Sequence, residues 1–300
     1  MSSAGDDRTG AAGSRRALLA EIRTRLAAAG VPTPHDDALR LLSAVPWSDA
    51  VVGVDGGADA GGSHLAANSD LARLVERREA REPLEYLTGV ARFRQLELAV
   101  GPGVFLPRRE SEVAVELALE ELRALPGEPI VVDLGTGSGA IALAVATEAP
   151  GTRVVGVEVS PAAYAFTEQN FRRFAPGNGR PVLADLRDAL PELDGTVDLV
   201  VANPPYIPSE GIPRDPEVRL HSPAVALFGG SDGLDLVRGV CATARRLLRS
   251  GGRLLVEHGE VQAASVSMLL PADHWSEISV HRDHLGRDRV TAARLRQDVG

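Results

Sequence analysis

Residues 203–206 read Asn-Pro-Pro-Tyr and directly follow an apolar run, Val197 to Ala202, that predicts a buried strand. The two prolines fix the backbone torsions and donate no N–H, so their carbonyl groups and the Asn203 side chain can face a ligand. Tyr206 adds a flat stacking surface. Ligands of open α/β sheets bind outside the carboxyl ends of the strands, and we interpret this segment as a binding loop. The alternative is a rigid turn with a strand-capping asparagine.

The chemistry that suits this loop is methyl transfer to an amide or amine nitrogen. An amide nitrogen is a poor nucleophile because its lone pair is delocalised. The side-chain oxygen of Asn203 and the backbone carbonyl of Pro204 can accept its two N–H groups and hold it in line with a methyl sulfonium, and such positioning contributes up to roughly 7–11 kcal/mol. The same bonds stabilise positive charge growing on nitrogen. We predict Asn203, Pro204, Pro205 and Tyr206 as catalytic residues, with no strong general base.

A second candidate site is the segment Asp133 to Gly139, Asp-Leu-Gly-Thr-Gly-Ser-Gly, between a predicted strand and a predicted helix. Its glycines allow a sharp turn and a close approach to a ligand. Gly135, Gly137 and Ala140 also satisfy the relaxed dinucleotide-binding pattern, and a turn without a ligand is a further alternative. Asp133 favours a different cofactor, because its carboxylate would crowd a pyrophosphate but could accept a ligand's ammonium group or hold the glycine loop.

Two acidic residues end the next two predicted strands. Glu158 follows about 20 residues after the glycine loop, a spacing that suits the hydroxyls of an adenosine ribose. Asp185 lies after the third strand and could reach the adenine edge. Each could instead be a strand-end charge that meets solvent.

The elements that must position these residues alternate as strand and helix. Such alternation predicts an α/β fold, a Rossmann-like, mostly parallel sheet with helices on both faces. We expect strands at 130–134, 153–158, 181–184, 197–202, 253–257, 277–281 and 289–295, and helices at 140–148, 162–174 and 233–248.

The N-terminal part has helical rather than alternating periodicity. Helices are expected at 14–29, 36–45 and 70–80, after a disordered tail over 1–13, with a flexible loop at 53–64. A short hairpin is expected at 90–100 and a helix at 110–124. We predict a helical substrate-recognition domain over 1–82, a linker with a hairpin over 83–107, and a catalytic domain over 108–300. The helices could also be a cap that only buries apolar surface.

The composition narrows the partners and the location. The net charge of −9 argues against a protein that grips nucleic acid mainly through phosphates, although it leaves room for a local basic patch. The single cysteine, Cys241, and the lack of a signal-like or membrane-spanning run lead us to expect a cytoplasmic protein. Cys241 is expected to be a small buried residue rather than a nucleophile. The scattered histidines lead us to expect no structural metal site.

The motifs together resemble the bacterial peptide chain release factor glutamine-N5 methyltransferases, the HemK/PrmC family. The resemblance runs from about Glu82 to the C-terminal region and rests on 82–89 (Glu-Pro-Leu-Glu-Tyr-Leu-Thr-Gly), 103–108 (Gly-Val-Phe-Leu-Pro-Arg), 133–139, 203–206, 222–227, 232–234, 255–259 and 286–289. It implies S-adenosylmethionine as cofactor, and as substrate the glutamine of the Gly-Gly-Gln loop in class I release factors. From the strand positions and the resemblance together, the predicted cofactor-binding residues are Phe105, Arg108, Asp133, Gly135, Thr136, Gly137, Gly139, Glu158, Asp185 and Asn203.

One position departs from the family pattern. The family usually reads Pro-Arg-Pro-Glu-Thr-Glu, whereas Arg109 replaces the second proline here, which is expected to loosen the start of the following helix and so to affect Arg108. Other functions remain open: methylation of an exocyclic amine in DNA or rRNA, which needs the same two acceptors; glutamine methylation of a ribosomal protein; or a binding protein that holds the cofactor without catalysis.

Overall fold

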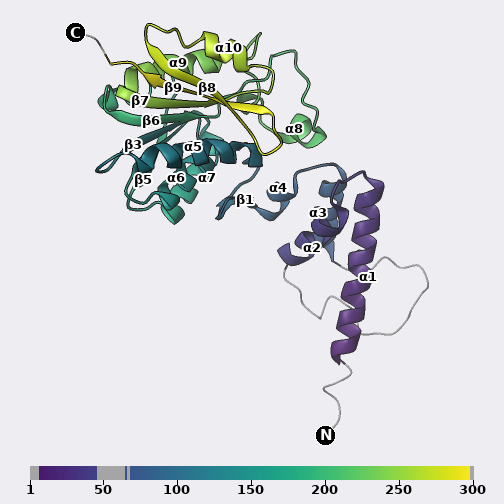
Figure 1. Ribbon diagram of the computed structural model, residues 1–300. Coiled ribbons are helices and arrows are strands. Elements are labelled where there is room, and N and C mark those ends of the chain that lie inside the picture. Colours follow the sequence, from purple (N-terminus) through teal and green to yellow (C-terminus); the bar gives the residue numbers. More distant parts are fainter. Residues whose placement is uncertain (1–6, 46–64, 66–67, 298–300) are drawn as a thin grey trace. The chain divides into compact units, whose positions relative to one another are not determined.

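The computed structural model describes residues 7–45, 65 and 68–297, and the chain forms two compact units. The helical unit comprises the chain up to Gly89 together with Arg214–His221, and the sheet unit comprises Val90–Pro213 and the chain from Ser222. Figure 1 shows the elements of each. Within the described residues, no helix is long and apolar enough to cross a membrane.

The helical unit contains α1 (Asp7–Ala28), α2 (Pro34–Ala44), α3 (Ser69–Glu79), α4 (Leu84–Thr88) and the distant α8 (Pro216–His221). Leu18, Ile22 and Leu26 of α1 recur every four residues and are buried against α2 and α3, so they form one apolar stripe. Asn68 begins α3 by accepting a hydrogen bond from the Leu71 N–H at 3.0 Å. The three predicted N-terminal helices are thus confirmed.

The predicted tail over 1–13 is wrong for residues 7–13, which belong to α1. The prediction rested on apolar residues at helical spacing, and these residues begin only after Ser14. A helix that is already nucleated by packing extends at low cost through further residues. Residues 1–6 and the loop predicted at 53–64 lie outside the described residues.

A buried ion-pair network holds the helical unit together. Arg78 of α3 is buried and donates to the Asp37 carboxylate of α2 and to the Glu217 carboxylate of α8, each at 2.7 Å. Arg81 also donates to Glu217, at 3.0 Å. The segment 214–221 is therefore fixed to helices that lie far from it in the sequence.

We predict that Arg78→Met destabilises the helical unit by about 3–5 kcal/mol, because it leaves the buried Asp37 carboxylate without its partner. The measurement is urea unfolding followed by far-ultraviolet circular dichroism. Arg73→Met is the matched control, since Arg73 lies on the same helix but is exposed and pairs with Asp70. Equal unfolding midpoints for the two variants would contradict the structural role of Arg78.

The sheet unit is built on a seven-stranded sheet in the order β5-β4-β3-β6-β7-β9-β8. The parallel strands are β3 (Ile130–Leu134), β4 (Arg153–Glu158), β5 (Gly179–Leu183), β6 (Val197–Ala202) and β7 (Leu248–Glu257). Strands β9 (Asp288–Leu295) and β8 (Trp275–Arg282) add an antiparallel edge. The predicted Rossmann-like, mostly parallel sheet is confirmed, and β7 begins five residues before its predicted start.

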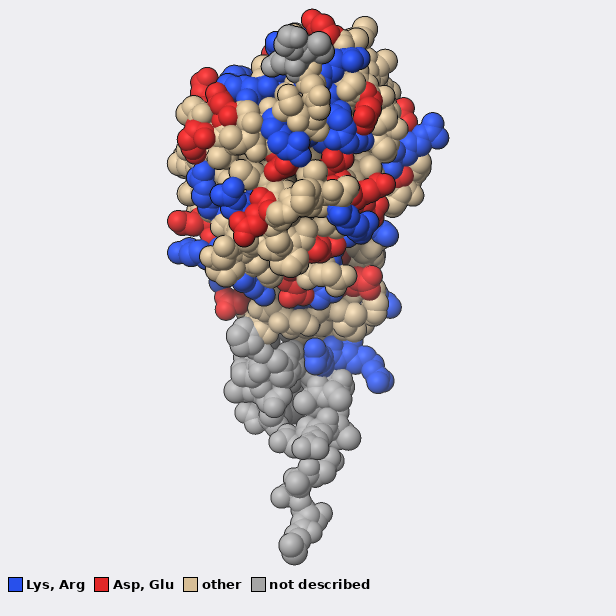
Figure 2. All heavy atoms as spheres, turned by 60° about the vertical axis from the view of Figure 1, so that its left-hand side comes forward, with Lys and Arg blue, Asp and Glu red and all other residues tan. Residues whose placement is uncertain are grey.

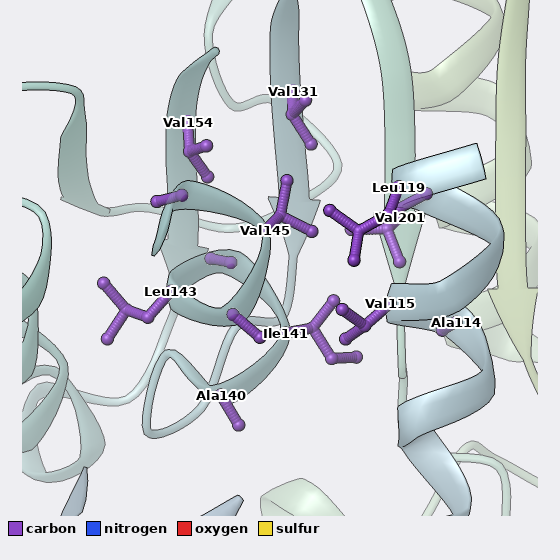
Figure 3. Packing of buried hydrophobic residues seen from close by; sticks show 14 of the residues in the cluster. Ala114, Val115, Leu119, Val131, Ala140, Ile141, Leu143, Val145, Val154 and Val201 are labelled. Atoms are coloured by element: carbon purple, nitrogen blue, oxygen red, sulfur yellow. The ribbon is translucent and has the colours of Figure 1, made fainter. Parts of the chain in front are cut away.

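Helices cover both faces of this sheet (Figure 1): α5 (Glu112–Arg123), α6 (Ala140–Glu148) and α7 (Pro161–Phe174) lie on one face, and α9 (Asp235–Leu247) and α10 (Ala263–Met268) lie on the other. Successive strand residues point to opposite faces, so Val131 joins the first core and Val132 the second. Figure 3 shows Val145 of α6 extending towards Val131 of β3, and Ile141 extending towards Val115 of α5. The predicted helices over this region are confirmed.

The remaining elements are short. The predicted hairpin is present as β1 (Val90–Phe93) and β2 (Leu96–Ala99), which pair antiparallel and pack on the α5–α7 side of the core. Short 3-10 turns in the described part of the sheet unit are η3 (Arg109–Ser111), η4 (Pro191–Leu193) and η5 (Ala224–Ala226).

Candidate active site

Strand register brings the two predicted loops together. Leu134 of β3 pairs with Ala202 of β6, so the glycine loop and the Asn-Pro-Pro-Tyr loop leave the sheet side by side. On the outer sides, Leu134 pairs with Val157 and Ala202 pairs with Val256. Neighbouring strands lie about 4.8 Å apart, so Glu158, the glycine loop from Gly135, Asn203 and Glu257 follow one another along one edge of the sheet. The strand order reverses between β3 and β6, which is where ligands bind in open α/β sheets.

The glycine loop has a backbone conformation that would be strained for any residue other than glycine. Gly135, Gly137 and Gly139 all have positive φ, at 81°, 57° and 85°. A Cβ atom on Gly139 would also lie 2.9 Å from a Leu143 methyl carbon. The N–H groups of Gly135 and Thr136 both donate to the Val157 carbonyl, at 2.9 and 2.8 Å. The loop is thereby folded back over the end of β4.

Asp133 lies beneath this loop and is almost fully buried. One carboxylate oxygen accepts hydrogen bonds from the Thr136 hydroxyl at 2.7 Å and from the Ala142 N–H at 3.2 Å. The other oxygen is buried with no hydrogen-bond partner among the described residues. Burial raises the pKa of Asp133 to about 7, against the effect of the Thr136 bond. Asp133 therefore holds the loop with one oxygen, and the other oxygen can accept from the ammonium group of a ligand.

Glu158 and Asp185 are hydrogen-bonded differently, which determines how many acceptor positions each carboxylate has left for a ligand. Glu158 accepts from the N–H groups of Gly137 at 3.0 Å and Ser160 at 2.8 Å, and burial raises its pKa. A third bond comes from the Val159 backbone. Because a carboxylate has about four acceptor positions, roughly one is left for a ribose hydroxyl. Asp185 follows β5 and bonds to the Arg187 backbone and guanidinium at 2.9 and 3.1 Å, so its adenine contact stays a prediction.

Phe105 and Arg108 contact one another in the segment that leads into α5. The Arg108 guanidinium lies over the Phe105 ring, 5.5 Å from its centre, a cation–π arrangement. The replacement at Arg109 does not prevent a helical start, because residues 109–111 form the turn η3 and Arg108 stays extended. An ion pair between Glu110 of this turn and Arg287, at 2.9 Å, anchors the turn.

The Asn-Pro-Pro-Tyr loop rests on the glycine-rich segment 228–233, of which the resemblance covers only residues 232 and 233. Ile207 forms a parallel bridge with Phe228. A Cβ atom on Gly229 would lie 2.4 Å from the Pro205 carbonyl oxygen, and one on Gly233 would lie 2.3 Å from that of Tyr206. The amide of Gln262 donates to the Tyr206 carbonyl at 3.0 Å. These contacts require glycine at 229 and 233.

Two residues near Asn203 were not predicted. The Asn203 amide nitrogen donates to the Ser111 hydroxyl at 3.2 Å, and Ser111 is hydrogen-bonded to the Glu257 carboxylate. Glu257 is buried, and its second oxygen has no partner among the described residues. The available signal was the one that marked Glu158: an acidic residue that ends an apolar strand at the sheet edge.

A nucleophilic role for Cys241 is disfavoured by its surroundings. Cys241 is buried, as predicted, and burial raises its pKa to about 12, which disfavours the nucleophilic thiolate. No group of three or more potential metal-ligating side chains occurs in the part of the chain that the structure describes.

Asp133 should make the stability of the ligand-free protein depend on pH. Its folded carboxyl keeps its proton up to about pH 7, whereas an unfolded aspartate releases it near pH ~4. Between these values the native state binds more protons, so the free energy of unfolding falls as pH rises. Asp133→Asn should make this fall shallower in thermal scans from pH 5 to about 8, while Asp188→Asn, at an exposed position, should not. An unchanged slope in Asp133→Asn would contradict the buried-carboxyl assignment.

Known proteins that are similar to this chain are methyltransferases. A family model described as a methyltransferase small domain matches residues 95–215. A protein from Streptomyces pristinaespiralis named 4-amino-L-phenylalanine/4-methylamino-L-phenylalanine methyltransferase is 46% identical over 68% of this chain and 71% of its own length.

Two relatives match over a longer span. A release factor glutamine methyltransferase of Streptomyces coelicolor is 46% identical, covering 92% of this chain and 98% of the relative. The protein of the same name from Mycolicibacterium smegmatis is 45% identical, with coverage of 94% and 98%. On identity at this level over nearly the whole of both proteins, the chain belongs to the release factor glutamine methyltransferase family.

Proposed function

We propose that this protein transfers a methyl group from S-adenosylmethionine to the side-chain amide nitrogen, N5, of the glutamine in the Gly-Gly-Gln loop of class I peptide chain release factors. The observation that carries the proposal is the pairing of Leu134 with Ala202, which sets a cofactor-type glycine loop beside an amide-binding loop. A substrate of this kind places the enzyme in the cytoplasm.

The cofactor suits the residues of the glycine loop. The unpaired oxygen of Asp133 would accept from its ammonium group, and the remaining acceptor position of Glu158 would take a ribose hydroxyl. Positive φ at Gly137 keeps the loop backbone open, with no side chain in the way. The family resemblance implies that Phe105 and Arg108 would lie beside the donor, and Asp185 would reach the adenine. When bound, the sulfonium supplies an electrophilic methyl group.

The substrate amide is positioned by Asn203 and Pro204. The NH₂ end of Asn203 donates to Ser111, so its oxygen end is turned the other way and can accept one N–H of the target. The carbonyl of Pro204 accepts the other. Charge that grows on the target nitrogen as its bond to carbon forms is stabilised by these two oxygens. The displaced amide proton leaves to solvent, so the chain needs no strong base.

The competing substrates are less well supported. Nucleic-acid methylation would favour a basic surface, whereas the net charge is −9 and Figure 2 shows basic and acidic side chains interspersed on the face in view. A small aromatic amine, as in the name of the S. pristinaespiralis relative, would need the same acceptors. That match covers only 68% of the chain, whereas the release factor enzymes of S. coelicolor and M. smegmatis are matched over 92% and 94% of it.

The direct test is mass spectrometry of a purified release factor after incubation with the enzyme and methyl donor. We expect one added methyl group on the peptide that contains the Gly-Gly-Gln glutamine. Asn203→Ala should slow transfer by about 100-fold or more with little change in donor affinity by calorimetry, because Asn203 grips the amide. Gly137→Val should abolish donor binding while the fold persists. Methylation elsewhere, or near-normal turnover by Asn203→Ala, would contradict the proposal.

The helical unit provides partner recognition in this proposal. A glutamine side chain is small and common, so selection of one protein requires further surface. Arg15, Arg16 and Arg23 of α1 are exposed. Other arginines of this unit are already engaged: Arg78 is buried in its ion pairs, and Arg25 and Arg77 pair with Glu79 and Glu82.

Charge reversal tests recognition more sharply than deletion of residues 1–82, because deletion would strip Glu217 of its partners Arg78 and Arg81. The triple variant Arg15→Glu, Arg16→Glu, Arg23→Glu should lower kcat/KM on intact release factor by about tenfold or more. Its rate on a short peptide with the target glutamine should match wild type. Equal activity of variant and wild type on intact release factor would show that the helices only cap the fold.

A further inference from the structure

An asparagine that grips a substrate amide must be held in one of its two orientations. Its oxygen end can accept the target N–H, whereas its NH₂ end would meet the same N–H donor to donor. The two ends are nearly equal in shape, so packing alone cannot distinguish them. Something that differs in hydrogen-bonding character must therefore select the orientation of Asn203.

The buried contacts behind Asn203 supply that selection. Ser111 is 4% exposed and Glu257 is 2% exposed, so water cannot readily replace either contact. An ionised carboxylate only accepts hydrogen bonds, and the hydroxyl of Ser111 has a single proton, which it donates to Glu257. The lone pairs of Ser111 are then left to accept, and only the NH₂ end of Asn203 can donate to them, at 3.2 Å.

We propose that Glu257 and Ser111 are positioning residues that fix Asn203 with its side-chain oxygen towards the target amide. This inference rests on the proposed function. It adds that Glu257 determines the donor–acceptor direction of the hydrogen bonds that run from Asn203 through Ser111 to Glu257. Strand register supports it independently, because Ala202 pairs with Val256 and the next residues, Asn203 and Glu257, leave adjacent strand ends at one level.

The same row of hydrogen bonds makes the rate of methyl transfer depend on pH. A protonated Glu257 can donate to Ser111, which then donates to Asn203 and favours the reversed amide. Burial raises the pKa of Glu257 to about 7, while its bond from Ser111 and the nearby Arg289 act in the opposite direction. The other titratable groups that face it or adjoin it are Glu110, Asp283, Tyr206 and His258. The rate of transfer should therefore fall as pH drops below about 7.

The test measures kcat on intact release factor from pH 5.5 to about 8.5. The donor is kept at saturating concentration, so that protonation of Asp133 cannot change the measured rate by weakening donor binding. Ser111→Ala should lower kcat by about 10- to 100-fold, as misplacement of a binding group does, and should leave donor affinity by calorimetry within about twofold. Ser111→Thr, which keeps the hydroxyl, should recover most of the rate. Glu257→Gln cannot ionise and should flatten the acid side of the profile.

Ser267→Ala is the matched control, since among the described residues this hydroxyl bonds back to the Ala263 carbonyl of its own helix α10. A wild-type rate and pH profile in Ser111→Ala, an equal loss in Ser111→Thr, or an unchanged acid side in Glu257→Gln would overturn the inference. If wild-type enzyme itself adds no methyl group to the release factor, the proposed function fails; if wild type is active and the variants behave like it, only the positioning role fails.

Discussion

Parallel pairing of β3 with β6 is the constraint on which the site depends. Leu134 and Ala202 lie opposite one another at the last position of each strand, so two loops nearly 70 residues apart in the chain begin as neighbours. The pairing is held by buried valines that alternate between two cores. A shift of one residue would turn those valines to the wrong face, and it would also separate the glycine loop from Asn203. Core packing and catalytic geometry are therefore fixed by the same register.

The carboxylates at this edge of the sheet are buried, and hydrogen bonds from nearby groups partly offset the cost of burying them. Glu158 accepts backbone N–H groups, and Asp133 accepts one backbone and one side-chain donor. Both carboxyl groups nonetheless have raised pKa values because burial disfavours the charged form. A cationic ligand would relieve this penalty at Asp133. The site is thus least stable when empty, which favours binding of a positively charged donor.

Sequence reasoning succeeded where local signals and the fold agree. The bounds of β3, β4 and β6 were predicted to the residue, because each is an apolar run bounded by glycine, proline or a polar residue. The loops after β3 and β6 were identified because glycine and proline restrict the backbone in characteristic ways. The helical start of α1 at Asp7 was missed because no packing pattern marks it.

Features that depend on tertiary contacts could not be predicted. Nothing local shows that 214–221 joins the helical unit, since that follows from Glu217 meeting Arg78 and Arg81. Gly229 is required by the Pro205 carbonyl, and Ser111 acquires its role only when Glu257 and Asn203 lie beside it. Such residues are fixed by partners that are distant in sequence.

The most direct test of this account is a crystal structure of the enzyme with S-adenosylhomocysteine and a peptide that carries the target glutamine. The account predicts that the glutamine amide nitrogen lies within hydrogen-bond distance of both the Asn203 side-chain oxygen and the Pro204 carbonyl, and faces the sulfur bound over the glycine loop. A glutamine held elsewhere, or one bound by the NH₂ end of Asn203, would contradict it.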